Sequence, residues 1–208
     1  MKKVGANAKV TKKKILDSAT NEFYAKGFDK ASLRDIWEKA NVTTGALYFF
    51  FKDKDDLFNN VIAPVVSSMK AFMNQHYASD EAFKKEVDLE KGNPKYDVAF
   101  FLVNSYFENK KVWYILYTNL RYPSIRKMIE CFIKKSIYHY QIVINNKLKE
   151  MNSDRQIDEI YVRQFVDILV FTLIHLFHDD CEKDEMMERA KRAVKMLRGA
   201  FRALWKEE

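Results

Sequence analysis

Apolar side chains recur at steps of three or four along almost the whole chain, the spacing that places them on one face of an α-helix. Ile15, Leu16, Ala19 and Phe23 form one such face, and Gly27 follows as a signal that ends a helix. No convincing alternation of apolar and polar residues, which would indicate a strand, interrupts this pattern. The sequence therefore predicts an all-α fold of about nine helices.

Residues with capping side chains divide the first part of the chain into short helices. Ser32 is expected to cap the second helix, and Asn41 follows where the chain reverses, because asparagine tolerates the left-handed backbone conformation. Thr43 or Thr44 then caps a third short helix, and Asp53 caps a long one. The pattern predicts two helices joined by a tight turn, within a small helical domain that ends in a long helix.

The second part of the chain differs in composition. A charged segment at 79–93 ends in Gly-Asn-Pro and is the most loop-like stretch. Residues 95–122 are rich in aromatics, and a long helix is expected at 123–151. Two final helices are predicted at 156–179 and 184–205.

The two final helices are predicted to form a dimer interface. The stretch Phe165–Phe177 is apolar nearly all round, so it should be buried on more than one side. The last helix carries a narrow apolar seam made of Met187, Ala190, Val194, Leu197, Phe201 and Leu204. The alternative is that both helices close a core within one chain, because periodicity alone does not separate these readings.

Charge favours a polyanionic partner. Lysine and arginine number 36 against 29 acids, a formal net charge of +7. The first fourteen residues contain six lysines and no acid. Such an arm would add affinity for DNA that does not depend on sequence, and the alternative is a disordered solubilising tail.

Targeting and redox signals are weak. Two cysteines form no disulfide framework, and no apolar region of a secretory signal follows the basic N-terminus. The most apolar stretch, Phe165–Phe177, contains polar residues and falls short of the ~18 apolar residues that span a membrane. These features predict a soluble, cytoplasmic protein without a membrane partner.

Catalytic signatures are not found in the sequence. It contains no phosphate-binding loop, no His-Glu-x-x-His motif, and no serine or cysteine with a candidate base nearby. We therefore expect neither enzymatic activity nor a cofactor. His175, His178 and Cys181 raise the possibility of zinc, but their spacing matches none of the common zinc patterns, and histidines at the end of a helix suit its dipole.

The short helices carry a recognisable motif. The sequence reads SLRDI at 32–36, ANVTTGALY at 40–48 and FKDK at 51–54, with Leu57 and Phe58 following. This pattern resembles the helix-turn-helix DNA-binding domain of the TetR (tetracycline repressor) family over about residues 11–61. The resemblance implies a DNA-binding domain at 1–58 and a helical ligand-binding and dimerisation domain at 59–208.

The resemblance also implies roles for single residues. Arg34 would contact guanine, and Ala46 would contact a thymine methyl group. Tyr48 and the serine and threonine hydroxyls would contact phosphates. The full set of expected DNA contacts is Ser32, Arg34, Thr43, Thr44, Gly45, Ala46, Tyr48 and Lys54. The chain departs from the family pattern at Asn41, in place of a turn glycine, and at Phe50, where a phosphate-contacting His or Tyr is common. Leu47, Phe51 and Phe58 are expected in the core.

The resemblance implies a regulator that responds to a ligand. A homodimer would bind a palindromic operator in double-stranded DNA and release it when a small hydrophobic or aromatic inducer binds. The candidate pocket residues are Phe101, Tyr106, Trp113, Tyr117, Tyr138 and Phe165. Taken alone, such aromatics form packed core more often than a pocket.

One alternative to this function is a regulator that is ligand-independent or controlled by a protein. The other is a helical enzyme or binding module with an incidental bundle.

Overall fold

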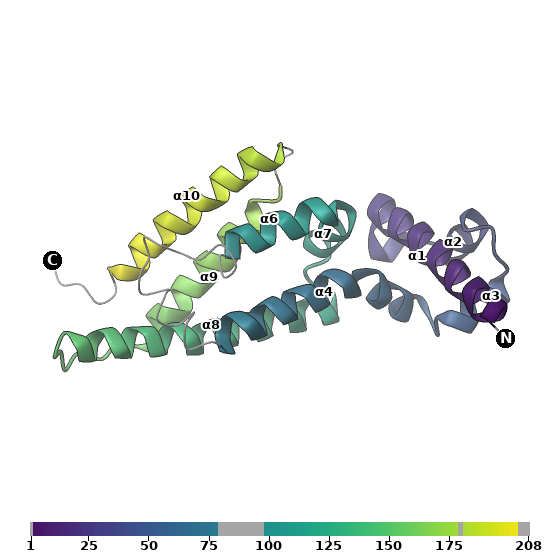
Figure 1. Cartoon of the computed structure of the whole chain (residues 1–208). Helices are drawn as coiled ribbons and strands as arrows, with labels where there is room; N and C mark the ends of the chain where they lie inside the picture. Colours follow the sequence, from purple (N-terminus) through teal and green to yellow (C-terminus); the bar gives the residue numbers. More distant parts are fainter. Residues whose placement is uncertain (1, 79–97, 179–180, 204–208) are drawn as a thin grey trace. The chain divides into compact units, whose positions relative to one another are not determined.

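The computed structural model describes residues 2–78, 98–178 and 181–203 of the chain. These residues contain nine α-helices and no strand (Figure 1), so the predicted all-α fold is confirmed. The helices are α1 (Lys2–Lys30), α2 (Leu33–Lys39), α3 (Thr44–Phe50), α4 (Lys54–Ala78), α6 (Val98–Glu108), α7 (Lys110–Thr118), α8 (Pro123–Glu150), α9 (Glu159–His175) and α10 (Lys183–Arg202). The predicted loop at 79–93, and Leu204 of the predicted seam, lie outside the described residues.

The chain packs as two compact units. The first unit comprises Met1–Ser68 and Asn109–Arg126, and the rest of the described chain forms the second. Two features account for this division. α4 continues as one helix through Phe58, and α7 packs against α1. By packing, α7 therefore belongs with the helices of the predicted DNA-binding domain.

The core of the first unit is aromatic. Phe23 from α1 lies edge-on to Phe58 of α4, with 5.1 Å between the ring centroids. Leu47 of α3 and Phe51, the residue that follows α3, are also buried, as their spacing of four residues predicts. Such edge-to-face pairs add to the free energy gained by burying the rings. The ring pair thus joins α1 to α4, and α2 and α3 pack on α1 and on each other.

The predicted caps at Ser32 and Thr43 are confirmed. The Ser32 hydroxyl oxygen accepts a hydrogen bond from the Asp35 amide at 3.3 Å, and the Thr43 hydroxyl oxygen accepts one from the Ala46 amide at 3.2 Å. Between these two caps Asn41 adopts a left-handed φ of 52°. The chain can therefore leave α2 and enter α3 within a tight turn.

Contacts from α7 and the turn after it reach α1 and α4 within the first unit. Lys111 donates a hydrogen bond to the Asn21 side chain at 2.6 Å. The Tyr122 hydroxyl donates to the Asp55 carboxylate at 2.5 Å, and its ring lies 4.4 Å from that of Phe58, centroid to centroid. Burial, with the hydrogen bond to Asp55, raises the pKa of Tyr122. Tyr122 therefore remains a neutral donor at physiological pH.

The apolar seam of α10 lies inside the second unit. α10 packs against α6 (Figure 1) and α9, and it buries Met186, Ala190, Val194, Leu197 and Phe201. Met186 takes the place predicted for Met187, one position away, which is only half-buried. Phe201 also meets Phe165 of α9 at 4.8 Å between ring centroids. The seam thus serves the core of its own chain, the alternative that periodicity left open.

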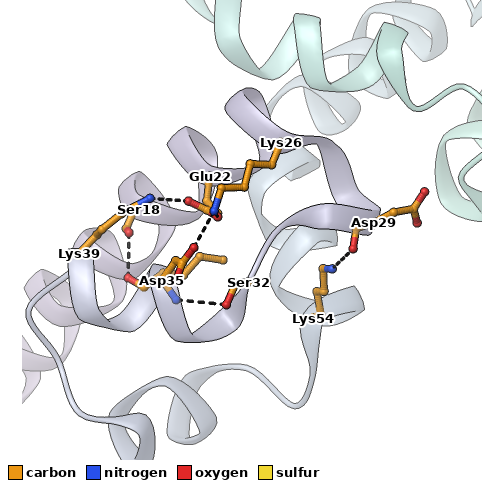
Figure 2. Close-up of polar contacts among 9 residues, drawn as sticks. Ser18, Glu22, Lys26, Asp29, Ser32, Asp35, Lys39 and Lys54 are labelled. Atoms are coloured by element: carbon orange, nitrogen blue, oxygen red, sulfur yellow. Dashed lines mark hydrogen bonds and ion pairs between the residues drawn. The ribbon is translucent and has the colours of Figure 1, made fainter.

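A buried acid joins α1 to α2. The Glu22 side chain is 1% exposed, and its carboxylate lies 2.6 Å from the amines of both Lys26 and Lys39 (Figure 2). Burial alone would raise the pKa of Glu22, but the hydrogen bonds and charges of the two lysines lower it to about 2. The carboxylate is therefore ionised throughout the physiological range.

This lowered pKa predicts a specific loss of stability in acid. Because the folded-state pKa of about 2 lies below the unfolded value of 4.5, the contribution is complete above pH 4.5 and is lost as the pH falls towards 2. The loss should reach about 3 kcal/mol, at 1.36 kcal/mol per pKa unit. Urea unfolding of the wild type and of Glu22→Gln, repeated from pH 6 to pH 2, measures it. Equal pH slopes for the two proteins would contradict the assignment.

Candidate nucleic-acid interface

The helix-turn-helix pair α2 and α3 presents one face to the core and the other to solvent. Each helix has seven residues, and each buries a single apolar side chain among them, Ile36 in α2 and Leu47 in α3. Nearly all other side chains of the pair are therefore exposed or half-buried. Two short helices with exposed outer faces meet the steric requirement for entering a DNA groove.

Arg34 is the most prominent charged group on α2. Its side chain is 74% exposed, and its Nε donates a hydrogen bond to Glu38 at 2.8 Å, one helical turn away. This hydrogen bond raises the pKa of Arg34. Ion pairs between exposed side chains at this spacing are weak, so the guanidinium can turn towards a base at little cost in free energy.

The predicted contact residues of α3 lie at or near the surface. Thr43, Thr44, Gly45 and Tyr48 are exposed and Ala46 is half-buried. The Thr43 hydroxyl oxygen serves the cap of α3 and keeps its own O–H available for a phosphate. Ser32 is likewise a half-buried cap of α2.

Phe49 is the residue that sequence reasoning missed. Its ring is 79% exposed and stands edge-on to Phe50 at 4.9 Å between centroids. The signal was present in the sequence: Leu47 and Phe51, four positions apart, define the core face, and Phe49 lies midway on the opposite side of the helix. A phenyl ring there can contact a thymine methyl group.

Lys54 has a structural role in addition to the predicted phosphate contact. Its amine donates a hydrogen bond to the backbone carbonyl of Asp29 at 3.1 Å (Figure 2) and lies 4.8 Å from the centroid of the Phe28 ring. The lysine therefore joins the start of α4 to the end of α1. A phosphate contact would have to share this amine or displace the carbonyl.

The basic arm is helical. α1 begins at Lys2, so residues predicted as an arm or a tail continue the first helix. Lys9, Lys13 and Lys14 are exposed on it. The half-buried Lys12 lies 5.4 Å from the centroid of the Phe51 ring. These lysines give α1 a positive surface next to the short helices, where phosphate attraction adds affinity.

The six predicted pocket residues are divided between the two units. By packing, Trp113 and Tyr117 of α7 belong to the first unit, and the other four belong to the second. In the second unit, Phe101 stacks on Phe72 at 4.2 Å between centroids, and Tyr106 stacks on Phe177 at 4.9 Å. Phe165 is buried against Tyr140 and Phe201, whereas Tyr138 is 72% exposed. These contacts are typical of core packing rather than of side chains that line a common ligand pocket.

A cavity of about 350 Å³ lies elsewhere, in the first unit between α1, α4 and α7. Its apolar lining includes Leu16, Val61, Pro64 and Val112, and none of the six predicted pocket residues lines it. Val112 lines this cavity, but no aromatic side chain of the stretch 95–122 does.

The rings of His175 and His178 stack on each other. The rings of His175 and His178 lie 4.8 Å apart between centroids, and Phe171 packs on His175 at 4.1 Å. Among the described residues no group of three or more His, Cys, Asp or Glu side chains is placed to hold a metal ion. Within the same residues, no helix is long and apolar enough to cross a bilayer.

Comparisons with known proteins agree with this arrangement. Residues 15–61 match the family model described as bacterial regulatory proteins, tetR family. A relative from Escherichia coli (strain K12), named "Probable acrEF/envCD operon repressor", is 38% identical over 60 residues. That match covers 29% of this chain and only 27% of the relative's own length.

Solved structures share the fold over nearly the whole chain. A transcriptional regulator of Aquifex aeolicus VF5 is 20% identical, with a TM-score of 0.61 over 89% of this chain and 98% of that one. The regulator FadR of Bacillus subtilis, solved in complex with stearoyl-CoA, is 17% identical, with a TM-score of 0.51 over 88% and 96%. Residues 15–61 therefore carry the helix-turn-helix sequence of the tetR family of bacterial regulatory proteins, and the described chain shares its helical fold with solved transcriptional regulators.

Proposed function

We propose that the protein is a sequence-specific transcriptional repressor that binds a palindromic operator as a homodimer and is released by a small hydrophobic or aromatic ligand. The observation that carries the proposal is the two-sided character of α3. Leu47 is completely buried, whereas Tyr48 and Phe49 beside it are exposed to solvent. Exposing large aromatic side chains to water is unfavourable in free energy, and binding to a nucleic-acid surface would bury them.

Base reading by this surface would be sparse. The Arg34 guanidinium would donate two hydrogen bonds to a guanine, and Ala46 and Phe49 would make apolar contacts with thymine methyl groups. Tyr48 and the threonine hydroxyls would hold phosphates and set the register. Because α3 has no Arg, Lys, Asn or Gln, the shape and deformability of the DNA would carry a larger share of the specificity.

The outer faces of α9 and α10 support the dimer. Ile168 and Phe171 of α9 and Met196 of α10 are exposed, Phe171 by 65%, although the inner faces of both helices are packed. Ala200, one turn after Met196, is also exposed and would allow close approach of a second copy. The proposed interface therefore uses the same helices as predicted, but different residues from the seam of α10.

The ligand is the least specified part of the proposal. The neighbour from Bacillus subtilis was solved with stearoyl-CoA, a ligand with a long apolar chain. A hydrophobic inducer for this chain would suit the apolar composition of its helical second domain. The competing version, a regulator that is ligand-independent or controlled by a protein, is favoured by the core-like packing of Phe101, Tyr106 and Phe165.

The DNA contacts are tested by comparing two variants. Arg34→Ala should cost about 1–3 kcal/mol of operator affinity and relax the preference at one base pair, because it removes a base contact. Lys54→Ala should weaken operator and unrelated DNA alike and reduce the salt slope by about one, because a phosphate carries no sequence information. Fluorescence anisotropy with both duplexes at several salt concentrations measures the two effects. Equal losses on both duplexes for Arg34→Ala would refute its base contact.

The dimer interface is tested by charge insertion. Phe171→Asp should convert the dimer into a folded monomer, because it places a charge within an apolar contact. Light scattering after size exclusion gives the mass, and circular dichroism checks the fold. Met151→Asp, at an exposed apolar residue beyond α8, is the matched control and should stay dimeric. A dimer that survives Phe171→Asp unchanged would rule out this face.

A further inference from the structure

The orientation of α2 is weakly determined by apolar packing. Within its seven residues only Ile36 is buried, and a helix of this length gains little stability from its own hydrogen bonds. One buried side chain fixes a point on α1, but it leaves the helix able to tilt and rotate about that point. Other contacts must therefore set the angle at which α2 presents its outer face.

Polar contacts from α1 meet α2 at three places along its length (Figure 2). The Ser18 hydroxyl donates a hydrogen bond to the backbone carbonyl of Ile36 at 2.8 Å. The Lys26 amine donates to the Asp35 carboxylate at 2.6 Å. The Lys39 amine donates to the Glu22 carboxylate at 2.6 Å. Contacts in the first turn, in the middle and at the last residue together fix both tilt and rotation.

Glu22 is the centre of this arrangement. Ser18, Glu22 and Lys26 follow one another at steps of four and so lie on one face of α1. The Glu22 carboxylate binds Lys39 directly, and it also binds Lys26 at 2.6 Å, which in turn holds Asp35. Removing this single carboxylate would release one end of α2 and loosen the other.

We infer that Glu22 is a positioning residue for DNA reading: its buried carboxylate, between Lys26 and Lys39, sets the angle of α2 on α1 and thereby the approach of Arg34 to a base. The inference rests on the proposed function. A buried ion pair is a poor source of net stability, because the charges lose their hydration. Its better-attested use is to select one geometry among several of similar energy.

The same contacts limit unspecific binding. Lys39 is 58% exposed and Lys26 is 40% exposed, so both amines could otherwise turn towards phosphates. Bound to Glu22, they contribute less to attraction that ignores sequence. Loss of the carboxylate should therefore lower the affinity for the operator and raise the affinity for unrelated DNA. The ratio of the two affinities is the quantity that Glu22 controls.

The experiment measures this ratio by anisotropy for the wild type, Glu22→Leu and Glu22→Gln, on the operator and on a scrambled duplex. Glu22→Leu should remain folded, because Lys26 and Lys39 are 40% and 58% exposed, so water can solvate their amines and no buried charge is left unpaired. Its ratio should nevertheless fall roughly tenfold or more, the size of one impaired base contact. Asp17→Asn, an exposed acid on the same helix, makes the same change in charge and should keep the wild-type ratio.

Lys39→Ala provides an independent variant should both Glu22 variants fail to fold. If Lys39 positions α2, its removal lowers the ratio; if it contacts phosphates instead, both affinities fall equally and the ratio stays constant. A wild-type ratio in folded Glu22→Leu, or a constant ratio in Lys39→Ala, would overturn the inference. A wild-type protein that does not distinguish the two duplexes would refute the proposed function instead, so the two failures are distinguishable.

Discussion

The shortness of α2 and α3 is the constraint on which the rest of the structure depends. Helices of seven residues do not persist by themselves in water, so their position must come from contacts with longer elements. α3 obtains it from the completely buried Leu47 and from its contacts with α1 and α2. α2 obtains it mainly from the polar contacts around Glu22. The position of the proposed DNA-reading surface therefore depends on the face of α1 on which α2 and α3 pack.

The same constraint explains how distant parts of the chain reach this surface. α7 packs on α1, and the Tyr122 hydroxyl bonds to Asp55 in the first turn of α4, all within the first unit. A shift of α7 would therefore displace α1, the helix on which α2 and α3 pack. α4 gives a second route, because it runs from the first unit into the second. In the proposed repressor, either route would connect ligand binding to the angle of Arg34.

Local signals made the first unit predictable and left much of the second undetermined. The caps at Ser32 and Thr43 and the left-handed Asn41 depend on neighbouring residues, and the structure confirms them. Glu22 was not singled out, because a single acid on a helix resembles a solvated charge until its partners on α2 are known. Tyr138 was grouped with the pocket aromatics by composition, yet it is exposed. The place of α7 beside α1 is a long-range contact that no local pattern encodes.

The central claim is that the outer face of α2 and α3 reads a DNA sequence. The most direct measurement is a gel shift of the purified chain with the duplex upstream of its own coding region, at low salt and with excess unrelated DNA. The account predicts a discrete complex that survives the competitor and is lost in Arg34→Ala. Failure of any specific complex to form, or its complete removal by unrelated DNA, would contradict the account.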